Sequence, residues 1–146
     1  MLIRPMTAGD FSAAAVIDAE FASPWTVQQI AAEYKREIAC TLVAENTSRK
    51  IVGWCCGFCI GPDAELLKIS VSSQWQKQGV ATALLQELCH LFIDTGGERV
   101  LLEVRSQNDA ALHLYLQSGW KKQGVRKNYY KKPVDDAILL VRSLIE

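Results

Sequence analysis

The 146-residue sequence lacks the features that define several large classes of protein. It has 16 Lys plus Arg against 16 Asp plus Glu, and this balance gives no whole-molecule argument for binding nucleic acid or a membrane. Its 49% hydrophobic and 22% charged residues exclude disordered, collagen-like and coiled-coil chains. No apolar stretch approaches the roughly 18 residues of a membrane span. The function must therefore come from a local site, which we expect in a single domain over residues 1–146.

The number and spacing of the cysteines also argue against disulfides and against a metal site. The five cysteines are an odd number, and no secretory signal pattern precedes the first predicted strand, so we expect a cytoplasmic protein with free thiols. Cys55 and Cys56 are adjacent and would point to opposite faces of a strand, which does not match a metal-binding knuckle. The sequence predicts that these cysteines pack as small hydrophobes and that there is no metal site.

The apolar periodicity predicts a mixed α/β chain. A strand at 2–6 is followed by two helices, whose expected starts carry capping-type residues at Thr7 and at Thr26 with Gln29. The later strands are expected at 40–45, 51–60, 65–71, 99–104, 121–130 and 137–145, and the later helices at 78–94 and 108–119. The strands at 40–45, 51–60 and 65–71 should form an antiparallel meander.

The helix at 78–94 joins the strands at 65–71 and 99–104, and such a crossover makes the two strands parallel neighbours. Ligands of open α/β sheets bind beyond the carboxyl ends of strands of this kind. We therefore expect the chemistry to lie close to Val71 and Val104, where these two strands end.

The segment after Val71 has the features of an anion site. Gln76-Lys77-Gln78-Gly79-Val80-Ala81 leads into the helix, and a glycine with a small residue two places on lets backbone N–H groups approach an anion closely. The N-terminus of the helix adds about half a positive charge. The spacing matches neither a Walker loop nor a dinucleotide fingerprint. On this motif alone, a helix that merely starts near a glycine remains an alternative.

The same segment resembles the Q/R-x-x-G-x-G/A motif of the GNAT N-acetyltransferases, whose backbone amides hold the pyrophosphate of acetyl-coenzyme A. The predicted order of elements is similar to that fold over essentially the full chain. The chain further resembles the RimI-type branch of the family, which acetylates the N-terminal alanine of a small-subunit ribosomal protein. The segments that carry this likeness are Pro24-Trp25-Thr26, Leu102-Glu103-Val104-Arg105, Asn108, Ala111, Leu114-Tyr115, Gly119-Trp120 and Arg126-Lys127-Asn128-Tyr129-Tyr130.

The resemblance implies a GNAT fold, an α/β (α+β) arrangement with a mixed sheet of six or seven strands flanked by about four helices. It implies acetyl-coenzyme A as co-substrate, Glu103 as the base that accepts the amine proton, and Tyr115 as the acid that protonates the leaving thiolate. The Val71 N–H would stabilise the oxyanion. The residues implied to bind the coenzyme are Ile69, Ser70, Val71, Gln76, Lys77, Gln78, Gly79, Val80, Ala81, Thr82 and Asn108.

The residues themselves are compatible with these roles. Acetyl transfer to an amine needs an unprotonated amine, a stabilised carbonyl oxygen and a proton for the thiolate. Glu103 stands between two apolar strand residues, so its side chain faces away from theirs. Tyr115 follows Asn108 by seven residues, about two helical turns, so both lie on one helix face. Without the resemblance, a surface glutamate and a core tyrosine remain alternatives.

Three functions stay open at this point. The chain could acetylate a protein N-terminus by direct transfer in a ternary complex, acetylate a lysine or a small-molecule amine, or bind acyl-coenzyme A without turnover. An α-amino group has a pKa of ~7.7–8.0 and a lysine one of ~10.4, so the former is more readily neutral at pH 7. The partner expected from the resemblance is a ribosomal-protein N-terminus, with no membrane and no required nucleic-acid contact. The basic residues of 121–132 form either a solvated face or a contact with coenzyme phosphate or a ribosomal surface.

Overall fold

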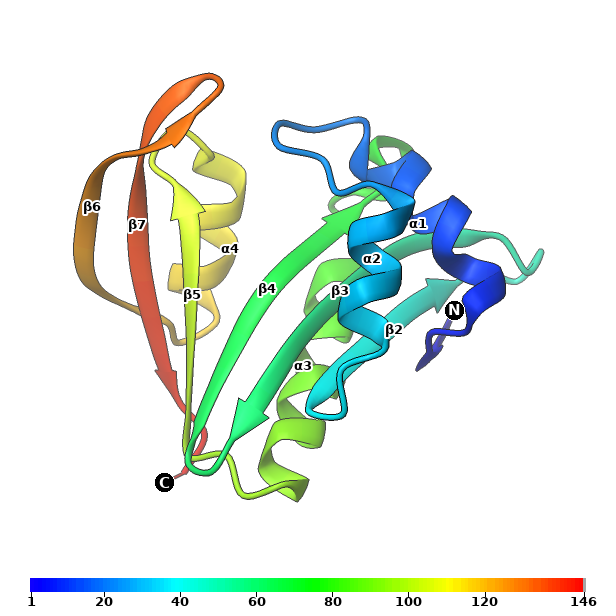
Figure 1. The fold of residues 1–146 in the computed structure, drawn as a ribbon, viewed down its shortest axis with the longest axis horizontal. Coiled ribbons are helices and arrows are strands. Elements are labelled where there is room, and N and C mark those ends of the chain that lie inside the picture. The colour runs from blue at the N-terminus through cyan, green and yellow to red at the C-terminus, as the bar shows by residue number, and fades with distance from the viewer. Residues whose placement is uncertain (146) are drawn as a thin grey trace.

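The computed structural model describes residues 1–145, and these form one mixed sheet of seven strands in the order β1-β2-β3-β4-β5-β7-β6 (Figure 1). The strands are β1 (Leu2–Pro5), β2 (Ala39–Glu45), β3 (Ile51–Ile60), β4 (Asp63–Val71), β5 (Arg99–Arg105), β6 (Lys121–Lys131) and β7 (Val134–Ser143). The helices are η1 (Ala8–Asp10), α1 (Phe11–Asp18), α2 (Val27–Tyr34), η2 (Ser73–Trp75), α3 (Val80–Asp94) and α4 (Asp109–Gln117). The predicted mixed α/β architecture is confirmed.

The strand pairing also follows the prediction. Strands β2, β3 and β4 form an antiparallel meander, and β4 and β5 are parallel neighbours joined by α3. The parallel pairing of β4 with β5 runs from Asp63 opposite Arg99 to Leu66 opposite Leu102. Beyond these residues the two strands diverge, and the sheet opens into a V whose arms are β4 and β5 (Figure 1).

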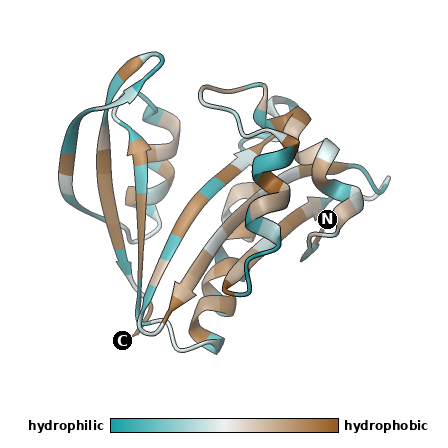
Figure 2. Cartoon of the chain, in the orientation of Figure 1, coloured by the Kyte–Doolittle hydropathy of each residue, from teal (hydrophilic) through white to brown (hydrophobic). Residues whose placement is uncertain are grey.

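Helices cover both faces of the sheet. The larger apolar cluster includes residues of α3 and α4 and packs on one face; the smaller cluster lies under α1 and α2 on the other. Cys55 belongs to the larger cluster and Cys56 to the smaller one, which confirms that these neighbours point to opposite faces. All five cysteines are free. Figure 2 shows apolar residues concentrated along the central strands and polar residues along much of β6.

The helix starts follow the local capping chemistry. At α2, the Gln29 N–H donates to Thr26 Oγ1 at 3.2 Å and the Thr26 N–H donates to Gln29 Oε1 at 2.8 Å, so the predicted capping box is confirmed. Several boundaries differ from the prediction by one to three residues, and two of these differences have a clear physical cause. Helix α3 begins at Val80, and not at residue 78, because Gly79 is left-handed with φ 85°. Strand β7 spans Val134–Ser143, and not 137–145, because its first residue pairs with the end of β6.

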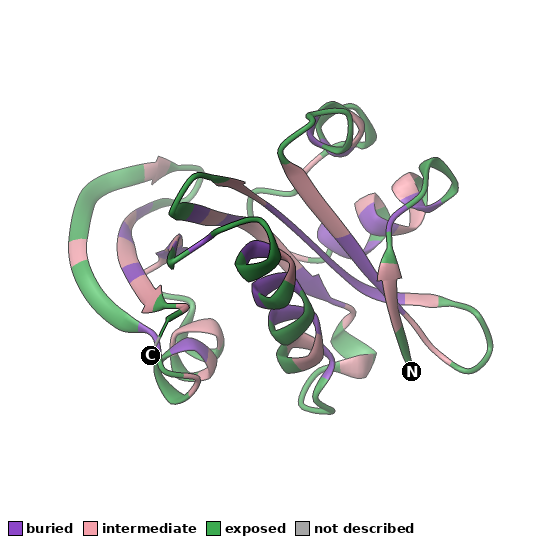
Figure 3. Ribbon diagram, turned by 90° about the horizontal axis from the view of Figure 1, so that it is seen from below, coloured by how far each residue is buried: buried purple, intermediate pink, exposed green. Residues whose placement is uncertain are grey.

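The edge strand β6 is the most exposed strand of the sheet, and only Gly124 and Tyr130 in it are partly buried (Figure 3). Its pairing with β7 is interrupted between Lys122 and Gly124 and again between Arg126 and Tyr130. Such irregularities bend a strand and re-aim its side chains. Among the described residues, no helix is long and apolar enough to cross a membrane.

Candidate active site

A cavity of about 710 Å³ occupies the opening between the diverging strands β4 and β5. Its walls come from the ends of both strands, the turn before α3, one face of α4 and the loop that joins α1 to α2 (residues 19–26). Glu103 is the one carboxylate among the described residues that line it. Every site residue predicted from the sequence lines this cavity except Gln78. The Gln78 side chain instead donates to the Gln74 carbonyl at 3.2 Å.

The turn before α3 is shaped by two left-handed residues. Lys77 has φ 61° and Gly79 has φ 85°, and a Cβ added at Gly79 would meet nothing within 4 Å. Alternation of this kind turns backbone N–H groups toward a common concave side. The free N–H groups of the first turn of α3 add to it, together with the positive end of the helix dipole. The turn therefore has the backbone conformation that an anion cradle needs, and a phosphate group fits its donor chemistry.

The end of β4 presents unpaired peptide groups to the same cavity. The Ser72 N–H bonds to the Val52 carbonyl of β3 at 2.8 Å. Since hydrogen-bonded and non-hydrogen-bonded pairs alternate along an antiparallel ladder, the peptide groups of Val71 and Ile69 point the other way, toward β5. Strand β5 has already diverged at this level. Gln76 Nε2 donates a hydrogen bond to the Val71 carbonyl at 3.2 Å. The Val71 N–H faces the opening.

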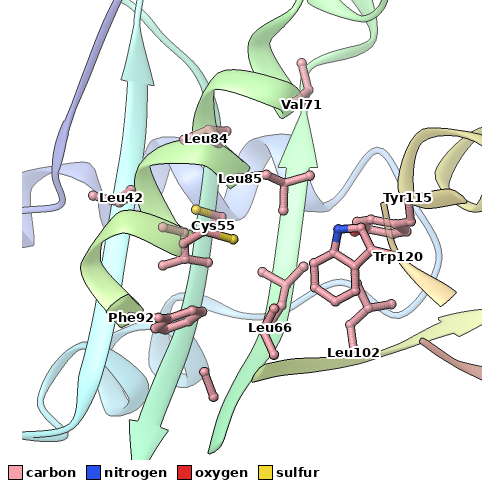
Figure 4. Packing of buried hydrophobic residues seen from close by; sticks show 14 of the residues in the cluster. Leu42, Cys55, Leu66, Val71, Leu84, Leu85, Phe92, Leu102, Tyr115 and Trp120 are labelled. Atoms are coloured by element: carbon pink, nitrogen blue, oxygen red, sulfur yellow. The ribbon is translucent and has the colours of Figure 1, made fainter. Parts of the chain in front are cut away.

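Helix α4 supplies Asn108 and Tyr115 on one side, as their spacing predicts. Asn108 caps the helix, and its Oδ1 accepts the Ala111 N–H at 3.2 Å. Tyr115 is 4% exposed, and its ring meets Trp120 edge to face with 5.5 Å between centroids. Figure 4 shows these two rings beside Leu66 and Leu102. Burial raises the pKa of Tyr115 well above its ordinary value, so its hydroxyl keeps its proton at neutral pH.

Glu103 lies on the opposite face of β5 from its neighbours. Leu102 and Val104 are buried in the larger apolar cluster, whereas the Glu103 side chain is 25% exposed and faces β6. Its Oε1 lies 3.6 Å from Nε of Arg126, whose side chain is 56% exposed. The ion pair is therefore long and half solvated, and such a pair holds a carboxylate only weakly.

The negatively charged carboxylate of Glu103 affects the pKa values of neighbouring groups. That charge is the main cause of the raised pKa of Tyr129. Burial raises the pKa of Glu65, and the charge of Glu103 adds to this effect. Burial and the same charge raise the pKa of Tyr130. The positive charges of Arg126, Arg105 and Arg36 oppose these shifts, so the region between β4, β5 and β6 contains charges of both signs.

Sequence reasoning did not identify a buried polar group that shapes this pocket. Asp18 is completely buried at the end of α1 and accepts hydrogen bonds from the Trp25 N–H at 2.6 Å and from the Ser70 hydroxyl. Lys68 Nζ lies 3.3 Å from its Oδ2. A signal was available, because Asp18 interrupts the apolar face that Ala14 begins. Ser70, predicted as a coenzyme ligand, turns its hydroxyl to this acid, and by the alternation along the ladder its peptide groups face Trp54 of β3.

Arg105, the last residue of β5, belongs to a segment that resembles the RimI-type enzymes, and the sequence predicts no role for it. In the structure it lines the cavity beside Glu103, and its guanidinium lies 4.2 Å from the ring centre of Tyr130. No group of three or more potential metal-ligating side chains gathers among the described residues.

Comparison with known proteins adds an independent finding. The profile of the Acetyltransferase (GNAT) family matches residues 11–120. A Bacillus subtilis (strain 168) protein provisionally named [ribosomal protein bS18]-alanine N-acetyltransferase is 29% identical over 140 residues, which cover 94% of this chain and 92% of the relative. The N-alpha-acetyltransferase RimI of Mycobacterium tuberculosis (strain ATCC 25618 / H37Rv) is 41% identical over 78 residues, covering 53% of this chain and 48% of the relative.

A solved structure is similar over nearly the whole chain. The crystal structure of the ribosomal-protein-S18-alanine N-acetyltransferase from Escherichia coli superposes with a TM-score of 0.88 at 28% identity. The match covers 99% of this chain and 94% of that one. The expected fold, a mixed sheet of six or seven strands flanked by about four helices, is thereby confirmed, and the sheet has seven strands.

Proposed function

The chain belongs to the GNAT family of acetyltransferases, and from that premise we propose that it transfers acetyl from acetyl-coenzyme A to the N-terminal alanine amine of a small-subunit ribosomal protein. The names of the Bacillus subtilis and Escherichia coli relatives support this acceptor. We further propose that residues 1–146 act as one domain and that the reaction takes place in the cytoplasm. No membrane or nucleic-acid contact is part of the proposal.

One observation carries the proposal. A single cavity runs from the backbone cradle before α3 to Glu103, the one carboxylate among its described lining residues. The cradle fits the pyrophosphate of the coenzyme, and the divergence of β4 from β5 leaves room for the pantetheine arm to lie along β4. An acceptor amine that approaches from the face of α1, α2 and β6 then meets the acetyl group beside Glu103.

The chemical step can be followed atom by atom. At neutral pH much of an α-amino group is protonated, and Glu103 accepts a proton so that the nitrogen lone pair can attack the thioester carbon. A C–N bond forms, and the negative charge that develops on the carbonyl oxygen is stabilised by the Val71 N–H. The attached nitrogen loses its second proton to water, and collapse of this intermediate breaks the C–S bond, forms the amide and releases coenzyme A as the thiolate.

Tyr115 then supplies the proton that the departing sulfur needs. Its buried phenol is neutral, since burial raises its pKa, so the proton is present when the thiolate leaves. A phenol is a weaker acid than a thiol, so proton transfer must be coupled to C–S cleavage and not precede it. Desolvation of the site increases the basicity of the leaving sulfur and favours this coupling.

Direct transfer is favoured over an acetyl-cysteine intermediate. None of the five cysteines is among the described residues that line the cavity. Burial raises the thiol pKa of Cys55, Cys56 and Cys89, and a thiol, unlike a thiolate, is a poor nucleophile. The amine and acetyl-coenzyme A must then be bound at the same time, which is a ternary complex.

The experiment compares two peptides. An alanine-initiated peptide copied from the ribosomal-protein target should release free thiol from acetyl-coenzyme A faster than the same peptide with a blocked N-terminus and a free lysine. Equal rates would indicate lysine acetylation. Firm coenzyme binding without release from either peptide would indicate a small-molecule acceptor or a binding module. Mass spectrometry of total ribosomal proteins from cells with and without this chain then identifies the acceptor.

A further inference from the structure

Two surface segments flank the side of the cavity on which Glu103 lies. One is the α1–α2 loop (residues 19–26), and the other is the β6–β7 turn (residues 132–133). Figure 1 shows them at the same end of the molecule, on opposite sides of the opening between β4 and β5. They belong to chain regions more than a hundred residues apart, and the sheet pairing does not connect them.

The side chain of Arg105 bridges these two segments. Its Nη2 donates to Ser23 Oγ in the loop at 2.6 Å, and its Nη1 donates to the Pro133 carbonyl in the turn at 2.9 Å. Nη2 also lies 3.3 Å from the Lys132 carbonyl, and the guanidinium covers the Tyr130 ring. The planar fork of arginine suits such simultaneous contacts, which a lysine could not reproduce.

Ser23 is held from its other side as well. Lys68 Nζ donates to the Ser23 carbonyl at 3.1 Å and lies 3.3 Å from the carboxylate of buried Asp18. Ser23 has φ 57°, a conformation that a non-glycine residue holds only when its surroundings impose it. A continuous polar chain therefore runs from Asp18 through Lys68, Ser23 and Arg105 to the β6–β7 turn.

We propose that Arg105 is a positioning residue for the acceptor, which joins the α1–α2 loop and the β6–β7 turn into one wall of the acceptor channel. Ser23, Arg105 and Tyr130 line the same cavity as Glu103, so a peptide that reaches the carboxylate passes this link. The link orders the wall before the peptide binds, which reduces the conformational entropy lost on binding. The inference rests on the proposed acetyltransferase function.

The Glu103 carboxylate is held by contacts that do not involve the Arg105 side chain, so Arg105 should affect acceptor binding and not the catalytic base. Asp135, at the start of β7, is anchored to the segment that follows β5, because it accepts hydrogen bonds from Ser106 Oγ and from the Gln107 N–H. Glu103 is held by the pairing of β5 with β7, where it lies opposite Leu139. Loss of the Arg105 side chain should therefore loosen the α1–α2 loop and the tip of the β6–β7 turn, while the Glu103 carboxylate stays in place.

The test combines peptide kinetics with amide hydrogen exchange of the protein without ligands. Arg105→Ala should raise the KM for the alanine-initiated peptide about tenfold, in keeping with the loss of charge-assisted hydrogen bonds. Its kcat, its pH–rate profile and its coenzyme affinity should stay within about twofold of wild type. Amides of residues 20–26 and 131–134 should both exchange faster. Arg105→Lys should restore KM in part, because an ammonium group can reach one segment but not both.

Two further variants make the test specific. Arg99→Ala is the matched control: Arg99 begins the same strand, pairs with Asp63 and lies outside the cavity lining. It should leave KM and both exchange rates unchanged. Ser23→Ala should raise KM less than Arg105→Ala does, because Arg105 keeps its contacts with the β6–β7 turn. The double variant should have the KM of Arg105→Ala, because the Ser23 hydroxyl acts only through Arg105.

Each contrary result has a separate meaning. An unchanged KM for Arg105→Ala, or faster exchange in the turn without the loop, would overturn the link. A fall in kcat with an altered pH profile would also overturn it, since Arg105 would then act in the chemistry. If wild-type protein acetylates neither peptide, the proposed function fails, and the exchange measurements still decide whether Arg105 joins the two segments.

Discussion

The two walls of the cavity are built in different ways. The coenzyme wall, residues 69–82, is continuous in sequence and offers mostly backbone groups: the end of β4, the left-handed turn and the first turn of α3. The acceptor wall consists of side chains from the α1–α2 loop, β5 and β6, and these include Glu103, Ser23, Arg105 and Tyr130. One wall is local and the other is assembled by tertiary structure.

This difference teaches how each wall should respond to substitution. Backbone donors survive most side-chain changes, so the coenzyme wall should tolerate substitution except where the backbone conformation itself depends on the residue, as at Gly79. The acceptor wall depends on single functional groups, so isosteric replacements there should be costly. Activity should thus be lost at the acceptor wall without loss of coenzyme binding, and coenzyme binding should be lost at very few positions.

The largest effect is expected at Glu103. Glu103→Gln preserves shape and removes the base, so turnover at pH 7 should fall by roughly 10²–10⁴ while coenzyme affinity stays nearly constant. The defect should shrink above ~pH 8, because most of an α-amino group is then already neutral. Pre-steady-state or steady-state release of thiol across pH 6–9, an interval chosen around roughly that α-amino pKa, measures both effects.

The matched control is Glu98→Gln, a glutamate next to β5 that does not line the cavity; it should keep wild-type turnover. If Glu103→Gln also turns over at nearly the wild-type rate at pH 7, Glu103 is not the base. Another carboxylate or a chain of waters would then take the proton, and the division between the two walls would need revision.

Tyr115 lies between the walls and tests where the proton for sulfur comes from. Tyr115→Phe should lower turnover by about 10², at the lower end for a general acid because the buried phenol holds its proton tightly. Unlike the loss at Glu103, this loss should persist as pH rises, since alkaline solution makes protonation of sulfur no easier. Coenzyme-induced thermal stabilisation should remain, and the half-exposed Tyr34 offers Tyr34→Phe as a control with normal turnover. Recovery of Tyr115→Phe at high pH would contradict the acid role.

Gly79 is the position where the coenzyme wall should be vulnerable. Wild-type protein at 100 times the dissociation constant of coenzyme A should gain ~2.7 kcal/mol of stability, and Gly79→Asp should abolish this gain. The substitution strains a left-handed residue and places a negative charge where a phosphate must bind. Thermal melts with and without millimolar coenzyme A measure the difference.

Gly96→Asp is the control for that variant, because Gly96 has φ 95° at the other end of α3 and equally open surroundings. It introduces the same strain and the same charge, and it should respond to the coenzyme like wild type. If coenzyme A leaves the melting temperature of the wild type unchanged, both the acetyltransferase function and the binding-module function are contradicted.

The smallest effect is expected outside both walls, at Asp10. Arg4 donates two hydrogen bonds to its carboxylate at 2.8 and 3.0 Å, and this contact lowers the pKa of Asp10 below its ordinary value of 3.8. Asp10→Asn should reduce the free energy of unfolding at pH 7 by about 1–2 kcal/mol. Urea titrations measure it, with exposed Asp94→Asn as the control.

The pH dependence of that loss has a definite sign. A lowered folded-state pKa means that the stabilisation is fully present above the unfolded-state pKa and disappears as pH falls through the folded-state value. The difference between wild type and Asp10→Asn should therefore begin to shrink below about pH 4, where the unfolded carboxylate becomes protonated. It should vanish only below the lowered folded-state pKa of Asp10. Turnover per folded molecule should not change. A stability difference that grows in acid would contradict the ion-pair explanation.

Much of the fold was predictable because it depends on local patterns. The antiparallel meander, the crossover through α3 and the capping box at Thr26 follow from periodicity and turn chemistry. The errors lie at boundaries: α3 begins two residues late because Gly79 is left-handed, and β7 is displaced toward the hairpin by its pairing with β6. These two boundaries depend on the backbone conformation of Gly79 and on pairing within the β6–β7 hairpin, and apolar periodicity contains no information on either.

The sequence by itself determined the coenzyme wall, since the strand, the glycine turn and the helix start that make it are consecutive and their geometry is set by local backbone preferences. It also singled out Glu103 and Tyr115 as candidates. Only the tertiary structure decided what surrounds them: the divergence of β4 from β5, the buried Asp18 and the bridge from Arg105 to Ser23. The reason is physical, because side-chain contacts between distant segments depend on how strands and helices pack, and packing is a property of the whole chain.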